Sequence, residues 1–205
     1  MRLGPRPVVP KIVTKTMTST ANVFSYLTVL ISIVLGLGIA HLLGGVARSV
    51  SRRKTTIFYW PTLVWILVLL ILIIQVWWVD ISLSRETQWT LPGFASTLLI
   101  PATLYFMSFL ILPETNDMRE TFFENRVWFF SLLVAVPIFG SLQQLLAEGH
   151  VHRDIDTITK GAGLVLALLA IYFGSEKAQK IFAIIGLVFV LAYVGEFFFH
   201  LPLAT

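Results

Sequence analysis

The sequence predicts an all-α membrane protein: a bundle of about six transmembrane helices, with one short interfacial helix between spans three and four. One observation is composition. Hydrophobic residues make up 57% of the 205 residues and charged residues only 13%, about half the charged fraction of a soluble domain. The other is patterning, because the apolar residues come in blocks, each long enough to cross a hydrocarbon core about 30 Å thick as a helix. The alternation typical of barrel strands is absent, so helices are expected.

Six apolar blocks account for the expected spans, at about residues 23–43, 57–79, 94–112, 128–146, 155–173 and 181–199. The fifth is the weakest signal, because its first turn is polar. Trp60 and Trp77 lie about 25 Å apart along the second block, as expected for aromatic residues at the two interfaces of a bilayer. Pro101 and Pro137 predict kinks in the third and fourth blocks, because a prolyl ring removes a backbone hydrogen bond.

The segment 115–126 is expected to form the short interfacial helix. Asp117, followed three residues later by Glu120, is typical of a capping box at a helix N-terminus. Three apolar residues would share one side of this helix: Met118, Phe122 and Phe123. Such a side suits a helix that lies along the membrane surface.

Residues 1–16 form a basic tail that contains three prolines. Met17 offers a second start, so the hypothesis is that the native chain begins there and that residues 17–205 form a single six-helix transmembrane domain. The chain has no cysteine, which excludes disulfides and thiolate ligands.

Basic residues beside the spans predict the orientation of the chain. If loops 44–56, 113–127 and 174–180 are cytoplasmic, eight of the 15 basic residues lie on that side: Arg48, Arg52, Arg53, Lys54, Arg119, Arg126, Lys177 and Lys180. The other side holds Arg85, Arg153 and Lys160, plus four basic residues of the tail. The positive-inside rule then favours both termini outside the cytoplasm, in a multi-pass protein of the kind found in bacterial inner (plasma) membranes. Lipid headgroups, rather than nucleic acid, explain the net charge of +4.

The densest group of potential metal ligands lies in the loop before the fifth span. His150, His152 and Asp154 alternate along the chain, and span six could add Glu196 and His200. Imidazole and carboxylate ligands suit zinc, iron or copper. The alternatives are a solvated loop, which is the usual setting of such a sequence, and a pH-responsive outer mouth built on the histidines.

His41 is the one histidine inside an otherwise apolar span. Gly38 and Gly45 lie on its side of the helix and could admit a flat ring such as a heme or another pigment, with the imidazole as axial ligand. The alternative is a hydrogen bond to a neighbouring helix. No cofactor is required by the sequence.

Three glutamines inside the spans could line a small hydrated pore or cavity: Gln75, Gln143 and Gln144. Polar side chains also join neighbouring helices without any role in transport, and that interpretation is preferred here.

The first span carries a small residue at every fourth position: Thr28, Ser32, Gly36, Ala40 and Gly44. Such a stripe lets two helix backbones approach closely in lipid, where hydrophobicity does not drive association. The partner helix could belong to this chain, to a second copy in a homo-oligomer, or to another membrane subunit.

These features leave three functional hypotheses. The preferred one is a non-catalytic membrane subunit or scaffold that packs with other membrane proteins, because the chain has little extramembrane mass and lacks phosphate-binding, nucleophile and dinucleotide motifs. The first alternative is a small oligomeric ion channel or permease. The second is a membrane-embedded metal or heme enzyme that uses the histidine-containing groups.

Overall fold

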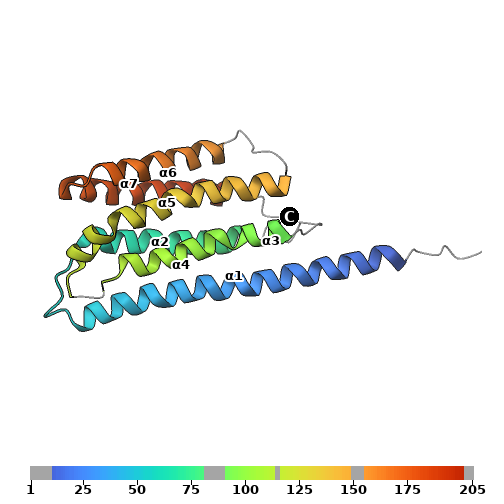
Figure 1. The fold of residues 1–205 in the computed structure, drawn as a ribbon, viewed down its shortest axis with the longest axis horizontal. Helices are drawn as coiled ribbons and strands as arrows, with labels where there is room; N and C mark the ends of the chain where they lie inside the picture. The colour runs from blue at the N-terminus through green and yellow to red at the C-terminus, as the bar shows by residue number, and fades with distance from the viewer. Residues whose placement is uncertain (1–10, 81–90, 114–115, 149–154, 201–205) are drawn as a thin grey trace, which may run out of the picture.

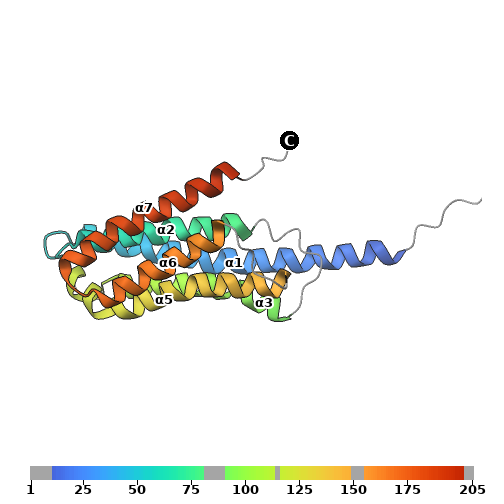
Figure 2. The same ribbon diagram turned by 90° about the horizontal axis from the view of Figure 1, so that it is seen from above.

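A computed structural model describes residues 11–80, 91–113, 116–148 and 155–200, and every regular element in these ranges is an α-helix. The helices are α1 (Lys11–Ser51), α2 (Trp60–Asp80), α3 (Leu91–Thr97), α4 (Leu99–Ile111), α5 (Met118–Glu148), α6 (Ile155–Tyr172) and α7 (Glu176–His200). They lie roughly side by side as an elongated bundle (Figures 1 and 2). The all-helical prediction is confirmed over the described residues.

Five stretches of the described helices are long and apolar enough to cross a membrane: Tyr26–Ser51, Trp60–Val79, Leu91–Ile111, Met118–Leu146 and Glu176–Gly195. The apolar part of α6, Thr157–Tyr172, is shorter. It coincides with the fifth predicted span, whose first turn is polar. The structure thus contains five candidate spans and one shorter apolar helix, where the sequence predicted about six spans.

The helices pack in successive layers. Helix α1 packs on α2 and α4; α4 packs on α5, α5 on α6, and α2 on α7. Helix α1 therefore forms one edge of the bundle, as Figure 1 shows. Its buried positions recur at steps of three or four residues, which places them on one side of the helix. This buried seam consists of Leu27, Ile31, Leu35, Gly38, Leu42, Gly45 and Ser49.

The centre of the core is Trp65 of α2. Its indole meets the rings of Phe129 and Phe130 of α5 edge to face, at centroid distances of 5.7 and 5.1 Å. On α7 the same indole lies over Gly186, where an added Cβ would come within 2.6 Å of the ring. A large side chain of α2 thus packs into a space that only glycine leaves open on α7.

The structure corrects the prediction of a separate interfacial helix at 115–126. Met118 begins α5, which continues without a break to Glu148. The Asp117 cap starts the helix as expected, but no glycine or proline follows before Pro137 to end it. The polar first turns are therefore the beginning of a long helix.

The two prolines act differently. Pro101 lies in the first turn of α4, and α3 ends at Thr97, four residues earlier. Because proline has no N–H to donate to the carbonyl four residues before it, the regular helix is interrupted at Leu98, whose backbone stays in the α-helical region with φ −84° and ψ −15°. Pro137 lies inside the continuous helix α5, where the Ser141 hydroxyl donates to the Pro137 carbonyl oxygen at 3.0 Å.

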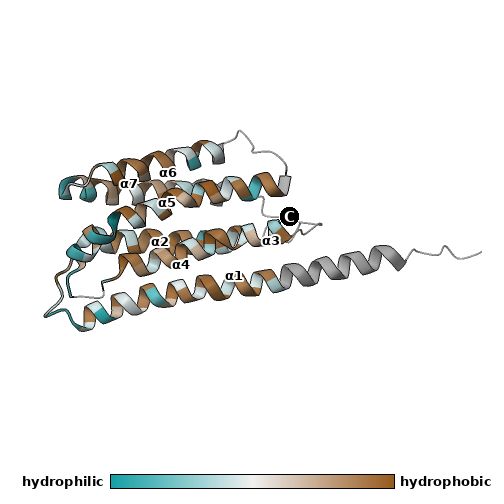
Figure 3. Ribbon diagram, in the orientation of Figure 1, coloured by the Kyte–Doolittle hydropathy of each residue, from teal (hydrophilic) through white to brown (hydrophobic). Residues whose placement is uncertain are grey.

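The turns that follow α1, α4 and α6 meet at one end of the bundle, named here the basic end (Figure 1). There the Ile57 amide donates to the Asn116 carbonyl oxygen at 2.7 Å, and the Met118 amide donates to the Ile57 carbonyl oxygen at 3.1 Å. Polar residues gather at this end, while the helix bodies are mostly apolar (Figure 3). The three loops expected to share a side of the membrane thus lie together.

Candidate functional site

A cavity of about 400 Å³ lies at the basic end, between the last turns of α1 and the end of α4. Its lining combines cationic, polar and apolar side chains: His41, Gly45, Arg48, Ser49, Arg52, Thr56, Phe109, Leu112, Pro113 and Asn116. We refer to it as the α1–α4 cavity. It is the strongest candidate site in the part of the chain that the structure describes.

His41 forms the apolar side of this cavity together with Phe109. The two rings stack with centroids 3.9 Å apart and planes 20° from parallel. Tyr105 packs edge-on against Phe109 at 5.1 Å. One face of the imidazole is therefore covered by an aromatic ring of α4.

The glycines beside His41 accommodate side chains of this chain. Beside Gly38, an added Cβ would meet the Ile73 side chain at 3.4 Å, and at Gly45 it would collide with the Leu112 side chain. The space beside each glycine is thus occupied by a side chain of another segment, Ile73 of α2 or Leu112 just after α4. The heme or pigment site at His41 stays a prediction.

Arg48 and Arg52 form the cationic side of the cavity. Arg48 folds back along α1, and its Nη1 lies 3.4 Å from where a Cβ of Gly44 would be. Both arginines are exposed, as are the neighbouring Arg53 and Lys54. Four positive charges therefore lie within seven residues at the end of α1.

Two residues that sequence reasoning did not single out hold α6 in place. Arg126 of α5 donates through Nη1 to the carbonyl oxygens of Ala170 and Ile171, both at 2.8 Å. Gln179 of α7 donates through Nε2 to Ala170 at 2.8 Å and to Phe173 at 2.7 Å. These side chains satisfy carbonyls that the last turn of a helix leaves without partners. In the sequence Arg126 counted only as a basic residue of the loop 113–127, and Gln179 gave no signal.

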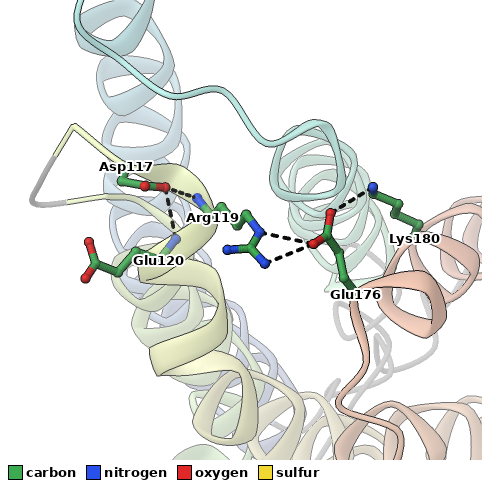
Figure 4. Close-up of polar contacts among 5 residues, drawn as sticks. All are labelled: Asp117, Arg119, Glu120, Glu176 and Lys180. Carbon is green, nitrogen blue, oxygen red and sulfur yellow. Dashed lines mark hydrogen bonds and ion pairs between the residues drawn. The ribbon is translucent and has the colours of Figure 1, made fainter.

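The start of α5 is tied to α7 by polar contacts at the surface (Figure 4). The Asp117 carboxylate accepts from the amides of Arg119 at 2.8 Å and Glu120 at 3.0 Å, so it caps α5. Arg119 donates through Nη2 to Glu176 at 2.9 Å, and Lys180 lies 2.8 Å from the same carboxylate. Exposed ion pairs of this kind contribute little to stability.

Tyr59 lies beneath these turns, against Phe122 and Phe123 at centroid distances of 5.6 and 5.9 Å. Burial, and secondarily the negative charge of Glu176, raises the pKa of Tyr59, while Arg119 opposes the shift. The phenol therefore stays neutral at any physiological pH.

The three predicted pore glutamines are not brought together. Thr62 donates to the Met118 carbonyl oxygen at 3.5 Å, so the starts of α2 and α5 are level. From there Gln75 lies about 20 Å along α2 and Gln143 about 37 Å along α5. The Oε1 atoms of Gln75 and Gln144 are buried without a hydrogen-bond partner among the described residues. Gln75 and Gln143 therefore lie at different levels of the bundle, and the pore hypothesis stays a prediction.

The predicted metal ligands all have side chains that the structure does not describe. His150, His152 and Asp154 lie outside the described residues, as do the side chains of Glu196 and His200. Within the described ranges, no group of three histidine, aspartate or glutamate side chains could hold a metal ion.

The small-residue stripe lies beside the buried seam of α1. Gly36 and Ala40 are exposed, and Thr28, Ser32 and Gly44 are half-buried. A Cβ at Gly36 would meet nothing within 4 Å. Ser32 accepts a hydrogen bond from Trp77 Nε1 of α2 at 3.2 Å, at the edge of the stripe. The described helices of the chain therefore leave the middle of the stripe uncovered.

Comparisons with protein-family models, with curated proteins and with solved structures found no match.

Proposed function

We propose that this chain is an integral membrane protein without a catalytic step of its own, which acts as a subunit by packing α1 against a helix of another membrane-embedded chain. The observation that carries the proposal is the open stripe of α1. Its central residue, Gly36, has open space beside it, while the buried positions of the helix lie on the neighbouring seam.

Support for membrane insertion comes from apolar side chains that point outward. Large exposed fractions occur on four different helices, for example 54% for Ile33, 58% for Ile74, 61% for Phe106 and 61% for Val188. Soluble monomers rarely expose contiguous apolar patches of more than a few hundred Å². A lipid surround removes that cost, and the helices satisfy their own backbone in it.

Support for an α1 interface comes from the positions of the small residues on this helix. Gly38 and Gly45 already let α1 approach α2 and α4 closely, as the side chains of Ile73 and Leu112 show. Gly36 and Ala40 would give the same close approach on the outer side of α1, at the edge of the bundle. Association between helices in lipid depends on such close backbone packing.

The experiment is native mass spectrometry of the protein released from mild detergent. Wild type is expected to carry a stoichiometric partner, either a second copy or a different chain. Gly36→Leu is expected to lose it, because the leucine side chain holds the two helices apart. Gly161→Leu on α6 is the matched control, since Gly161 is also exposed with nothing within 4 Å of an added Cβ.

The proposal fails if wild type is released as a bare monomer. It also fails if both leucine variants lose the partner equally, because α1 would then have no special role.

A further inference from the structure

The lining of the α1–α4 cavity contains two positively charged side chains. Arg48 and Arg52 line it one helical turn apart, and the described part of the lining contains no carboxylate. Glu114, the next residue after Pro113, lies outside the described residues. The other polar groups of the lining are neutral hydrogen-bonding side chains: Ser49, Thr56 and Asn116.

The end of α1 would normally repel an anion, because the last carbonyls of a helix carry partial negative charge. Here the following turn satisfies part of them. The Arg52 amide donates to the Arg48 carbonyl oxygen at 3.0 Å, and the amides of Thr55 and Thr56 donate to that of Arg52 at 2.9 and 3.0 Å. The Thr56 hydroxyl also donates to the Arg52 oxygen at 3.1 Å. Two guanidinium charges therefore outweigh about half a charge from the helix end.

Another part of the lining is aromatic and apolar. His41 and Phe109 stack there, and Leu112 closes the space beside Gly45. The candidate spans of α1 and α2 end and begin at Ser51 and Trp60. The cavity thus lies where the apolar helix bodies give way to polar turns, which is the level of lipid headgroups in an embedded bundle.

We infer that the α1–α4 cavity binds the phosphodiester headgroup of an anionic phospholipid. Arg48 and Arg52 donate to the phosphate oxygens, a pairing for which the guanidinium fork is well suited. The glycerol and the start of the acyl chains lie along His41 and Phe109. A free phosphate ion would satisfy the arginines but would leave this apolar side unfilled.

The inference rests on the membrane insertion proposed above, but not on the α1 partner. Native mass spectrometry separates the two, because lipid adducts report on the cavity and the mass of the complex reports on the partner. The protein is released from micelles that contain phosphatidylglycerol or phosphatidylcholine with identical acyl chains. Inorganic phosphate and glycerol 3-phosphate are tested as competitors.

Wild type is expected to retain phosphatidylglycerol over phosphatidylcholine by at least about tenfold in apparent affinity. The double variant Arg48→Gln/Arg52→Gln is expected to lose this preference. Its matched control is Arg53→Gln/Lys54→Gln, which removes the same charge from the same turn at two exposed positions outside the cavity lining. The control is expected to keep the preference.

Equal losses in the two double variants would overturn the inference, because a diffuse basic surface would then explain lipid binding. Displacement of the lipid by inorganic phosphate at equal concentration would also overturn it, since the ligand would then be the free anion. All four substituted positions are exposed, and circular dichroism confirms that each variant is folded before the lipid measurement.

Discussion

The backbone of Gly174 lies directly against the guanidinium of Arg126: a Cβ at position 174 would be 2.8 Å from Nη2. The same guanidinium donates to the carbonyl oxygens of Ala170 and Ile171. The end of α6 is therefore held by α5 through a charged side chain that reaches the last turn only because residue 174 has no side chain.

Arg126→Met is expected to destabilise the protein by about 2 kcal/mol, because hydrogen bonds from a charged donor to two helix-end carbonyls are lost. Unfolding in mixed micelles, followed by circular dichroism, measures the effect. The matched control Arg53→Met changes an exposed arginine outside the cavity lining and should leave stability nearly unchanged. Equal stabilities would show that Arg126 does not hold α6.

Gly186→Ala is expected to cost about 1–3 kcal/mol, because the new methyl group overlaps the Trp65 ring, which is also packed against Phe129 and Phe130. Trp65→Phe combined with Gly186→Ala should recover part of that loss, since the smaller ring leaves room for the methyl group. Gly161→Ala is the control. It removes a glycine from an exposed helix position with open space, so it should be neutral or stabilising by up to about 1 kcal/mol.

Asp117→Ala is expected to destabilise the start of α5 by about 1 kcal/mol, because the amides of Arg119 and Glu120 lose their acceptor. Asp117→Asn keeps an acceptor oxygen and should retain most of the stability. The comparison is made by thermal unfolding in detergent. An alanine variant as stable as the asparagine variant would contradict the capping role.

Single cysteines test whether the basic end is on one side of a membrane, since the chain has no cysteine of its own. Arg53→Cys and Ser175→Cys are both exposed and lie in turns at the basic end. They are expected to be protected from an impermeant maleimide in intact cells and to react after permeabilisation. Arg153→Cys, in the loop expected on the other side, should react without permeabilisation. Labelling of positions 53 and 175 from opposite sides would contradict the topology.

The helical class and five apolar segments long enough to span a membrane followed from the sequence, because block length and apolar composition are local properties of the chain. The fifth predicted span corresponds to a shorter apolar helix. The cap at Asp117 was also predictable, since a capping residue and the amides it accepts from are neighbours in the chain. The continuity of α5 was not predictable from the sequence, because polar first turns are equally typical of a separate surface helix and of the start of a longer helix.

The candidate site depended on tertiary structure. His41 was selected from the sequence for its isolation in an apolar span, but its partner Phe109 lies 68 positions away along the chain on α4. In the sequence, Arg48 and Arg52 were interpreted as topology signals. The structure shows that both line a cavity beside α4. Likewise, the sequence showed that small residues lie along α1, but it did not show which faces of α1 the other helices cover.

Composition and patterning by themselves determined that this chain forms apolar helices joined by short polar turns, with its basic residues concentrated in alternate turns. Only the packing of those helices decided which glycines have a neighbouring side chain against them, which glycines have open space beside them, and which residues share a cavity with Arg48 and Arg52. The physical reason is that hydrogen bonding within a helix is local, whereas the contacts of its side chains depend on which distant segment lies against each face.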